Sequence, residues 1–188
     1  MDLSGLILLA IIAVATFYII FIYNNLVSLK HAVSKAWSNI DVLLKQRHDE
    51  LPKLVEVCKQ YMQYETETLE KIIKARSAVM TANGQGDIKG LGQAESALRL
   101  GLGNLFALAE NYPDLKANQN FLGLQDSLEG TENRISVERT RYNEAVKEYN
   151  VAIKQFPGKL AASMFGFGPA ELFESNSAAA DPVPVEFN

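Results

Sequence analysis

The sequence predicts an all-α fold, in which an N-terminal transmembrane helix is followed by an antiparallel bundle of long helices with coiled-coil-like packing. The 188-residue chain has only six prolines and no apolar alternation of any length, which argues against an all-β fold. Long stretches instead repeat apolar residues at steps of three and four, as one face of a helix does. We therefore expect an anchor (1–23), a helical bundle (24–157), an aromatic segment (158–173) and an acidic tail (174–188).

The first element is an uncharged apolar run from Leu3 to Tyr23. As a helix its 21 residues span about 31 Å, which is the thickness of a bilayer core. A cleaved signal peptide is disfavoured because the run is long and has no Lys or Arg before it. Lys30 and Lys35 follow the run, so the positive-inside rule places the N-terminus outside and the bundle in the cytoplasm. The prediction is a single-pass anchor.

Residues 24–82 contain no glycine, and apolar or small residues recur from Ala36 to Val79 mostly at steps of three, four or seven. Pro52 interrupts this stretch without changing the phase of the pattern. The unchanged phase favours a kink in one long helix. A single unbroken helix, however, would be longer than the rest of the chain could cover, which favours a new helix that begins at Pro52. The bundle has four helices if the first one is split there.

A second helix is expected from Ile88 to Asn111, after the glycine-containing break at 82–87. Its two "GLG" triplets indicate close helix packing rather than a hinge, and no phosphate-binding glycine loop is present. Pro113 then ends the helix, and Asn111, Asn118 and Asn120 are candidate caps. This corner around Tyr112 is interpreted mainly as a turn between helices, with a binding loop as the alternative.

The last long helix is expected from Asn118 to Phe156, with a three-four seam. The seam positions are Phe121, Leu124, Leu128, Thr131, Ile135, Glu138, Tyr142, Val146, Tyr149, Ile153 and Phe156. The polar side chains on or beside the seam have two alternative explanations. Either they specify the register or the oligomeric state of the packed helices, or they are solvated neighbours of the seam. The candidate interaction or assembly residues are Glu132, Asn133, Arg134, Tyr142, Asn143, Tyr149 and Asn150, together with Tyr112, Phe165 and Phe167.

The aromatic segment (158–173) has three alternative roles: it caps the bundle, lies at the membrane interface or docks a partner. The tail (174–188) is of low complexity and is predicted to be disordered. All 18 Lys and Arg lie between Lys30 and Lys159, and they form no basic stripe, so nucleic-acid binding is not expected.

No pattern typical of catalysis is found in the sequence. His31 and His48 belong to no metal-binding helix motif, so we expect no metal, no cofactor and no catalytic residues. The alternative for His48, a metal or proton-relay role in "RHDE", is less favoured than a solvated charged turn. Cys58 lies on the apolar face and is interpreted as a core residue rather than a nucleophile. The protein is not expected to be an enzyme.

Several blocks resemble the LemA family of bacterial membrane proteins. They are "AWSNIDVLLKQRHDELPKLVEVCKQY" (36–61), "LEKIIKAR" (69–76), "AENYPDLKANQNFLGLQDSLEGTENRI" (109–135), "RYNEAVKEYN" (141–150), "FP" (156–157) and "FGF" (165–167). The resemblance implies a membrane-anchored antiparallel bundle, usually of four helices, with a boundary or strong kink at Pro52. Some members are associated with bacterial organelle membranes, and the genes often neighbour a membrane metalloprotease. The glycine-rich connection at 83–92 and the extension after Phe173 depart from the family.

These observations give two functional hypotheses. The first is a non-enzymatic scaffold at the bacterial inner membrane that forms homo-oligomers and organises lipid or membrane proteins. The alternative is an adaptor or regulator of a membrane metalloprotease in envelope quality control. The expected partners are the lipid bilayer, further copies of the chain and, in the alternative, the protease.

Overall fold

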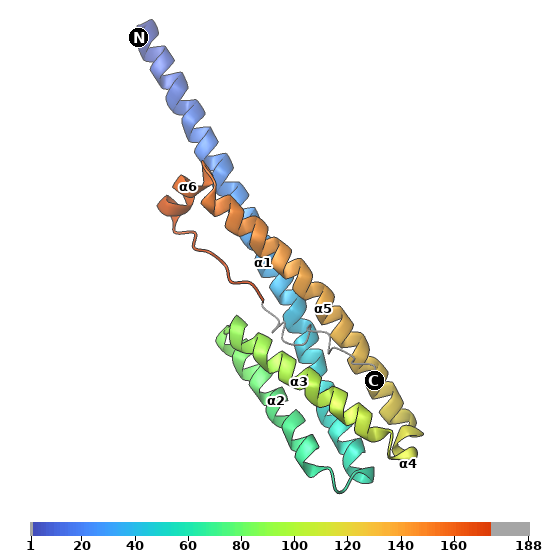
Figure 1. Cartoon of the computed structure of the whole chain (residues 1–188). Helices are drawn as coiled ribbons and strands as arrows, with labels where there is room; N and C mark the ends of the chain where they lie inside the picture. Colours follow the sequence, from blue (N-terminus) through green and yellow to red (C-terminus); the bar gives the residue numbers. More distant parts are fainter. Residues whose placement is uncertain (1, 174–188) are drawn as a thin grey trace, which may run out of the picture. The chain divides into compact units, whose positions relative to one another are not determined.

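The computed structural model describes residues 2–173, and this part of the chain forms six helices and no strand (Figure 1). The helices are α1 (Leu3–Tyr61), α2 (Thr66–Gln85), α3 (Ile88–Ala109), α4 (Pro113–Lys116), α5 (Gln119–Lys154) and α6 (Gly158–Phe165). The predicted all-α fold, with a long N-terminal apolar helix followed by a helical bundle, is confirmed. The acidic tail (174–188) lies outside the described residues.

Helix α1 runs through Pro52 without a break. Of the two alternatives left open at Pro52, the structure therefore has the continuous helix and not the boundary. The chain first turns at residues 62–65, so the expectation of one helix through residue 82 is wrong. The apolar pattern did not reveal this turn because Met62 and Leu69, on either side of it, are both buried and are seven residues apart. The spacing keeps the heptad phase although the backbone reverses direction.

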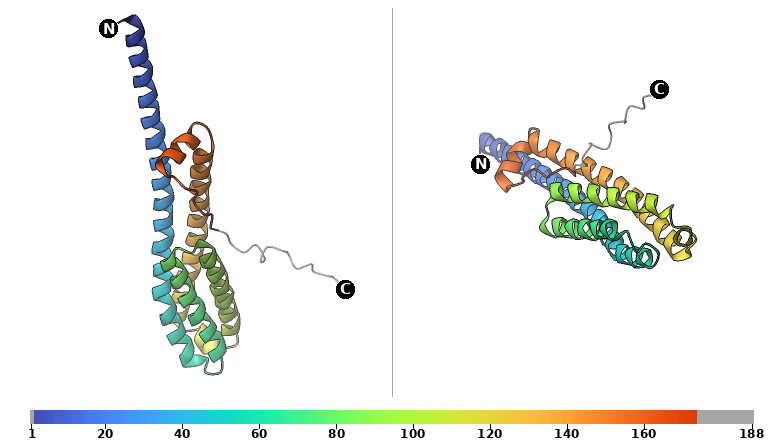
Figure 2. Two further views of the ribbon diagram at one scale, coloured as in Figure 1. Left: turned by 90° about the vertical axis from the view of Figure 1, so that its left-hand side faces the viewer. Right: turned by 60° about the horizontal axis from the view of Figure 1, so that its bottom comes forward.

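The expected break at 82–87 is observed only at Gly86 and Asp87, because α2 continues to Gln85. Gly86 ends α2 with a φ of 69°, a left-handed conformation that suits glycine. The Asp87 carboxylate then caps α3 by accepting a hydrogen bond of 2.8 Å from the N–H of Gly90. Helices α2 and α3 lie side by side and antiparallel (Figures 1 and 2).

Of the glycines in α3, Gly101 lies at a close contact with a neighbouring helix, as the packing interpretation predicts. A Cβ atom on this residue would lie 3.3 Å from Cγ1 of Ile72 in α2. The absence of a side chain therefore lets the two helices approach closely.

By its contacts the chain divides into two units, and α1 and α5 contribute to both. Unit 1 comprises residues 2–39 and 139–172, and unit 2 comprises residues 40–138 with Phe173. The core of unit 1 consists of Leu26, Tyr149, Ile153, Ala161 and Ala162. In unit 2 every helix contributes buried side chains, which include Ile40, Leu44, Leu51, Cys58, Ile72, Leu98, Leu105, Leu115, Phe121, Leu128 and Ile135.

The seam predicted on the last long helix is nearly complete. Of its eleven positions, eight are buried, and Leu124 and Glu138 are half-buried. Phe156 is the exception, with 81% of its side chain exposed. Helix α5 ends at Lys154, because Pro157 disfavours a helical conformation for the residue before it.

Candidate functional site

The C-terminal segment (residues 166–172) follows α6 and is held on α5 by three of the predicted residues. The hydroxyl of Tyr142 donates to the carbonyl of Glu171 at 2.9 Å, and the hydroxyl of Tyr149 donates to the carbonyl of Gly168 at 2.8 Å. Asn150 contacts both backbone groups of Ala170, as donor at 2.8 Å and as acceptor at 2.9 Å. These side chains bind backbone groups of the segment, so the contact depends little on which side chains the segment carries.

Burial raises the pKa of both tyrosines in this contact. For Tyr142 the carboxylate of Glu171 adds to the effect of burial, and for Tyr149 burial acts alone in raising the pKa. The neutral hydroxyl is therefore favoured, which is the form that donates the hydrogen bond.

An aromatic cluster joins the end of the apolar run to α6. The ring of Tyr23 lies 4.9 Å from that of Phe165 and 5.8 Å from that of Phe167, both in edge-on geometry. The ammonium group of Lys30 lies 5.7 Å from the centre of the Phe167 ring. Two of the predicted residues thus contact α1 where the apolar run ends: Phe165 and Phe167 both contact Tyr23, and Phe167 also contacts Lys30.

Unit 2 contains a buried ion-pair network centred on Arg47, whose side chain is 1% exposed. It pairs with Glu95 of α3 and, at 2.5 Å, with Glu132 of α5. A buried charge without a partner is costly, so the three helices are held in one register by this arginine. Of these three residues, only Glu132 was predicted from the sequence.

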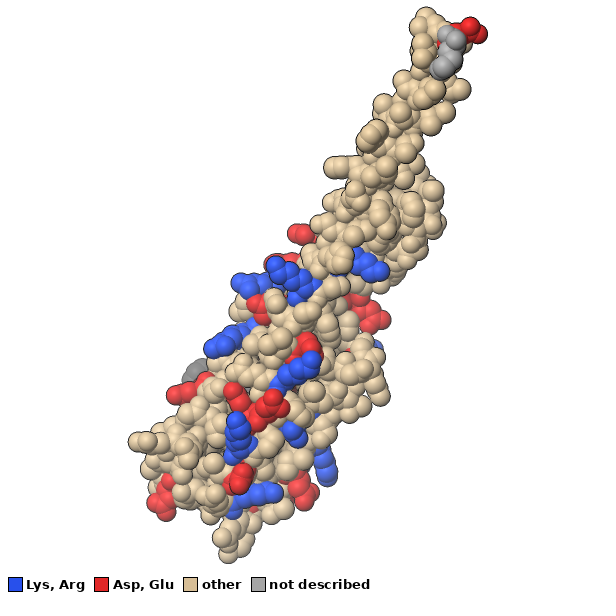
Figure 3. All heavy atoms as spheres, turned by 180° about the vertical axis from the view of Figure 1, so that it is seen from behind, with Lys and Arg blue, Asp and Glu red and all other residues tan. Residues whose placement is uncertain are grey.

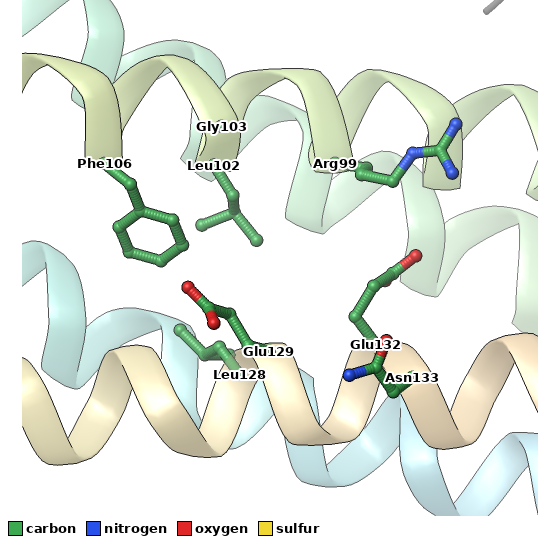
Figure 4. Close-up of a pocket in the computed structure, with 8 residues that line it drawn as sticks. All are labelled: Arg99, Leu102, Gly103, Phe106, Leu128, Glu129, Glu132 and Asn133. Carbon is green, nitrogen blue, oxygen red and sulfur yellow. The ribbon is translucent and has the colours of Figure 1, made fainter.

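Beside this network a groove of about 280 Å³ lies between α3 and α5 (Figure 4). Leu102, Phe106 and Leu128 provide its apolar lining. Its polar lining consists of Arg99, Glu129, Glu132 and Asn133. In Figure 4, Arg99 projects from α3 on the side of the groove opposite Glu132 and Asn133.

The corner before α5 is held by Asn118, as expected for a cap. Its side-chain oxygen accepts hydrogen bonds from the N–H groups of Asn120 and Phe121, at 2.9 and 3.2 Å, and its amide donates to the hydroxyl of Tyr61 at 3.1 Å. The hydroxyl of Tyr112 donates to Glu65 at 3.3 Å. This corner is packed against the turn between α1 and α2.

The ten predicted residues therefore do not form one site. Tyr142, Tyr149 and Asn150 hold the C-terminal segment, Phe165 and Phe167 belong to the aromatic cluster, and Glu132 and Asn133 line the groove. Arg134 is exposed on α5, and Asn143 is half-buried. Arg47 and Glu95 were not predicted from the sequence. A signal was present, because Arg47 is in phase with the buried Ile40, Leu44 and Leu51.

Two residues with possible reactivity lie in unit 2. Cys58 is buried, and burial raises the pKa of its thiol to about 11, as the core interpretation predicts. His48 faces Arg76, at 2.7 Å between Nε2 and a guanidinium nitrogen, and its pKa is lowered by burial and by that positive charge. Within residues 2–173 no three His, Cys, Asp or Glu side chains come together as a metal site would require.

The fold and these contacts define an all-helical protein whose N-terminal helix begins with an exposed apolar segment. The profile of the LemA family matches residues 36–187, and the chain belongs to this family. Magnetosome protein MamQ of Magnetospirillum gryphiswaldense is 28% identical over 185 residues, which cover 86% of this chain and 68% of that protein. Protein LemA of Metamycoplasma hominis is 26% identical over 172 residues, which cover 90% of this chain and 78% of that protein.

Proposed function

We propose that this protein is a membrane-anchored, non-enzymatic scaffold that self-associates at the bacterial inner membrane and organises lipid or other membrane proteins. The observation that carries the proposal is the exposed apolar start of α1. It is long and apolar enough to cross a membrane, and none of its most apolar 18-residue window is buried. The core helix of a soluble protein would instead be covered by other elements.

The continuity of α1 supports an anchor over a removable leader. Helix α1 runs without a break from Leu3 to Tyr61. Leu26, only three residues beyond the apolar run, is already in the core of unit 1, and Ile22 packs against that core. Cleavage after the run would therefore disturb packed structure. Lys30 and Lys35 follow the run and no Lys or Arg precedes it, which supports a cytoplasmic bundle.

Self-association is supported by the groove between α3 and α5. Its apolar lining and charged rim suit a side chain presented by a second copy of the chain. Anchoring confines all copies to two dimensions, which raises the effective concentration for weak contacts. A role in membrane organisation also agrees with the resemblance to family members that are associated with bacterial organelle membranes.

The proposal is tested by the mass of the complex extracted from its native membrane in lipid-polymer discs. We expect an assembly of several copies of this one chain. A variant that fills the groove, Gly103→Trp, is expected to reduce the assembly to single copies. A Cβ atom at Gly103 meets no neighbour within 4 Å, so the added side chain need not disturb the helix. The matched control is Gly123→Trp on α5, where a Cβ atom is equally unobstructed.

Single copies of the unmodified chain in the discs would contradict the scaffold. If a membrane protease were recovered with it in stoichiometric amount, the result would favour the adaptor hypothesis. Deletion of residues 174–188 would then show whether the tail is required for recovery of the protease. Equal assembly of Gly103→Trp and the unmodified chain would exclude the groove as the contact surface.

A further inference from the structure

Helix α6 has two faces of different character. Ala161 and Ala162 are buried in the core of unit 1 against Leu26, Tyr149 and Ile153. On the other face, Leu160 is 58% exposed and Met164 is 70% exposed. These two residues are four apart, so they lie on one side of the helix. Phe156, which lies just before α6, is 81% exposed.

The position of this apolar face follows from the contacts of α6 with α1. The core that includes Ala161 and Ala162 is packed against Ile22, Leu29 and Val33. Phe165, the last residue of α6, contacts Tyr23, the last residue of the apolar run. In Figures 1 and 2, α6 lies beside α1 where the uncovered part of that helix begins. The face is therefore next to the point at which the apolar run ends.

The charged side chains nearest to α6 in the sequence are lysines, and Glu148 and Glu171 are the first acidic residues on either side. Residues 3–40 and 149–170 contain no Asp or Glu, and their charged side chains are Lys30, Lys35, Lys154 and Lys159. All four lysines are exposed. Seen from behind, the N-terminal part of the molecule is an uncharged surface below its acidic tip, and charged side chains of both signs begin at its lower border (Figure 3). Lysines at such a border match the anionic head groups of a phospholipid leaflet.

We propose that α6 and the adjoining Phe156 form a second membrane contact, which inserts Phe156, Leu160 and Met164 into the interface of the anionic leaflet where the span ends. An apolar helix face lies in the plane of such an interface, and flanking lysines stay with the head groups. A helix of eight residues acts here together with the span. Because it is fixed to α1 by the aromatic cluster, its insertion sets the tilt and rotation of that helix. This inference rests on the proposed membrane anchoring.

The experiment measures how deeply a spin label lies in the bilayer. Single cysteines are introduced in the full-length protein as Met164→Cys, Val14→Cys and Val42→Cys, and each is labelled with a nitroxide. The buried native Cys58 is not expected to react, and a Cys58→Ala background checks this. The proteins are placed in nanodiscs of phosphatidylcholine and phosphatidylglycerol, and collisions with oxygen and with a water-soluble nickel chelate are measured.

The two valines are matched controls on the same helix, because Val14 is 70% exposed within the apolar run and Val42 is 64% exposed well beyond it. We expect the label at position 164 to collide preferentially with oxygen, as the label at position 14 does. An aqueous pattern at position 164, like that at 42, with a lipid pattern at position 14, would overturn the inference and leave the anchor intact. An aqueous pattern at position 14 would overturn both.

The lipid head group is tested with the same label. In nanodiscs of phosphatidylcholine alone, the label at position 164 is expected to shift toward the aqueous pattern, because the lysines lose their anionic partners. An unchanged pattern would overturn the assignment of the anionic head group as the ligand. Circular dichroism of each labelled variant must show the helicity of the unmodified protein, and Leu160→Cys provides a second position on the same face.

Discussion

Arg76 of α2 donates a hydrogen bond of 2.9 Å from its Nε to the backbone carbonyl of His48 in α1. In an uninterrupted helix this carbonyl would accept from the residue four positions later, which here is Pro52. Proline has no N–H to donate. A side chain from the neighbouring helix thus replaces the missing helical hydrogen bond, and α1 continues past the proline.

This relationship predicts an energetic coupling between Pro52 and Arg76. Arg76→Met alone is expected to lower the free energy of unfolding by about 1–3 kcal/mol, because the carbonyl loses its donor. In a Pro52→Ala background the loss should be smaller by about 1 kcal/mol, since the N–H of the new alanine can bond to the same carbonyl. Urea denaturation of the four proteins measures the coupling, and strictly additive effects would contradict it.

Arg47 is expected to be the most sensitive charged residue. Arg47→Met leaves the buried Glu95 without its positive partner and should lower the free energy of unfolding by about 3–5 kcal/mol. The double variant with Glu95→Leu should recover most of this loss. The control is Lys45→Met, which removes an exposed pair with Asp41 and should cost less than about 1 kcal/mol. If Arg47→Met also cost less than about 1 kcal/mol, the buried network would contribute little to stability.

His48 is expected to make stability depend on pH. Burial and the charge of Arg76 lower its pKa below the ordinary value of 6.5, so the unfolded chain takes up a proton first as the pH falls. The contribution of His48 is therefore complete above pH 6.5 and is lost as the pH falls below it. His48→Gln should reduce the slope of unfolding free energy against pH below this value, whereas His31→Gln, on an exposed position of α1, should not. Equal slopes for His48→Gln and the unmodified protein would exclude this explanation.

Asn150 is expected to hold the C-terminal segment in place. Asn150→Ala removes both hydrogen bonds to Ala170 and should lower the free energy of unfolding by about 1–2 kcal/mol. It should also speed proteolysis within residues 166–172, because the segment is released more often. Asn104→Ala, at an exposed position of α3, is the control and should leave the cleavage rate unchanged. An unchanged rate for Asn150→Ala would mean that the two tyrosines suffice.

Cys58 is expected to react with thiol reagents only after unfolding. Its pKa of about 11 and its burial leave almost no accessible thiolate at pH 8. Labelling should therefore be absent in buffer and rapid in concentrated urea, whereas a cysteine introduced at the exposed Val42 should react in both. Rapid labelling of Cys58 in the folded protein would contradict its assignment to the core.

Much of the core could be predicted from periodicity because burial in a helix recurs at steps of three and four. The positions from Phe121 to Ile153 follow that pattern, and most of them are buried. The candidate site was predictable only in part. Tyr142, Tyr149 and Asn150 stood out as polar residues on or beside the seam, but nothing local indicated that they bind the backbone of residues 168–171. Hydrogen bonds to backbone groups leave no pattern in the residues that are bound.

The sequence by itself determined the exposed apolar segment, the helical class and the register of the seam, because each depends on composition or on local spacing. Tertiary structure decided the rest. Helix α1 passes Pro52 because Arg76, 24 residues further along the chain, supplies a hydrogen bond to His48. Arg47 is tolerated at a core position because Glu95 and Glu132 meet it from two other helices. In both cases a residue that local rules would exclude is accommodated by a distant partner, whose position is fixed only when the helices pack.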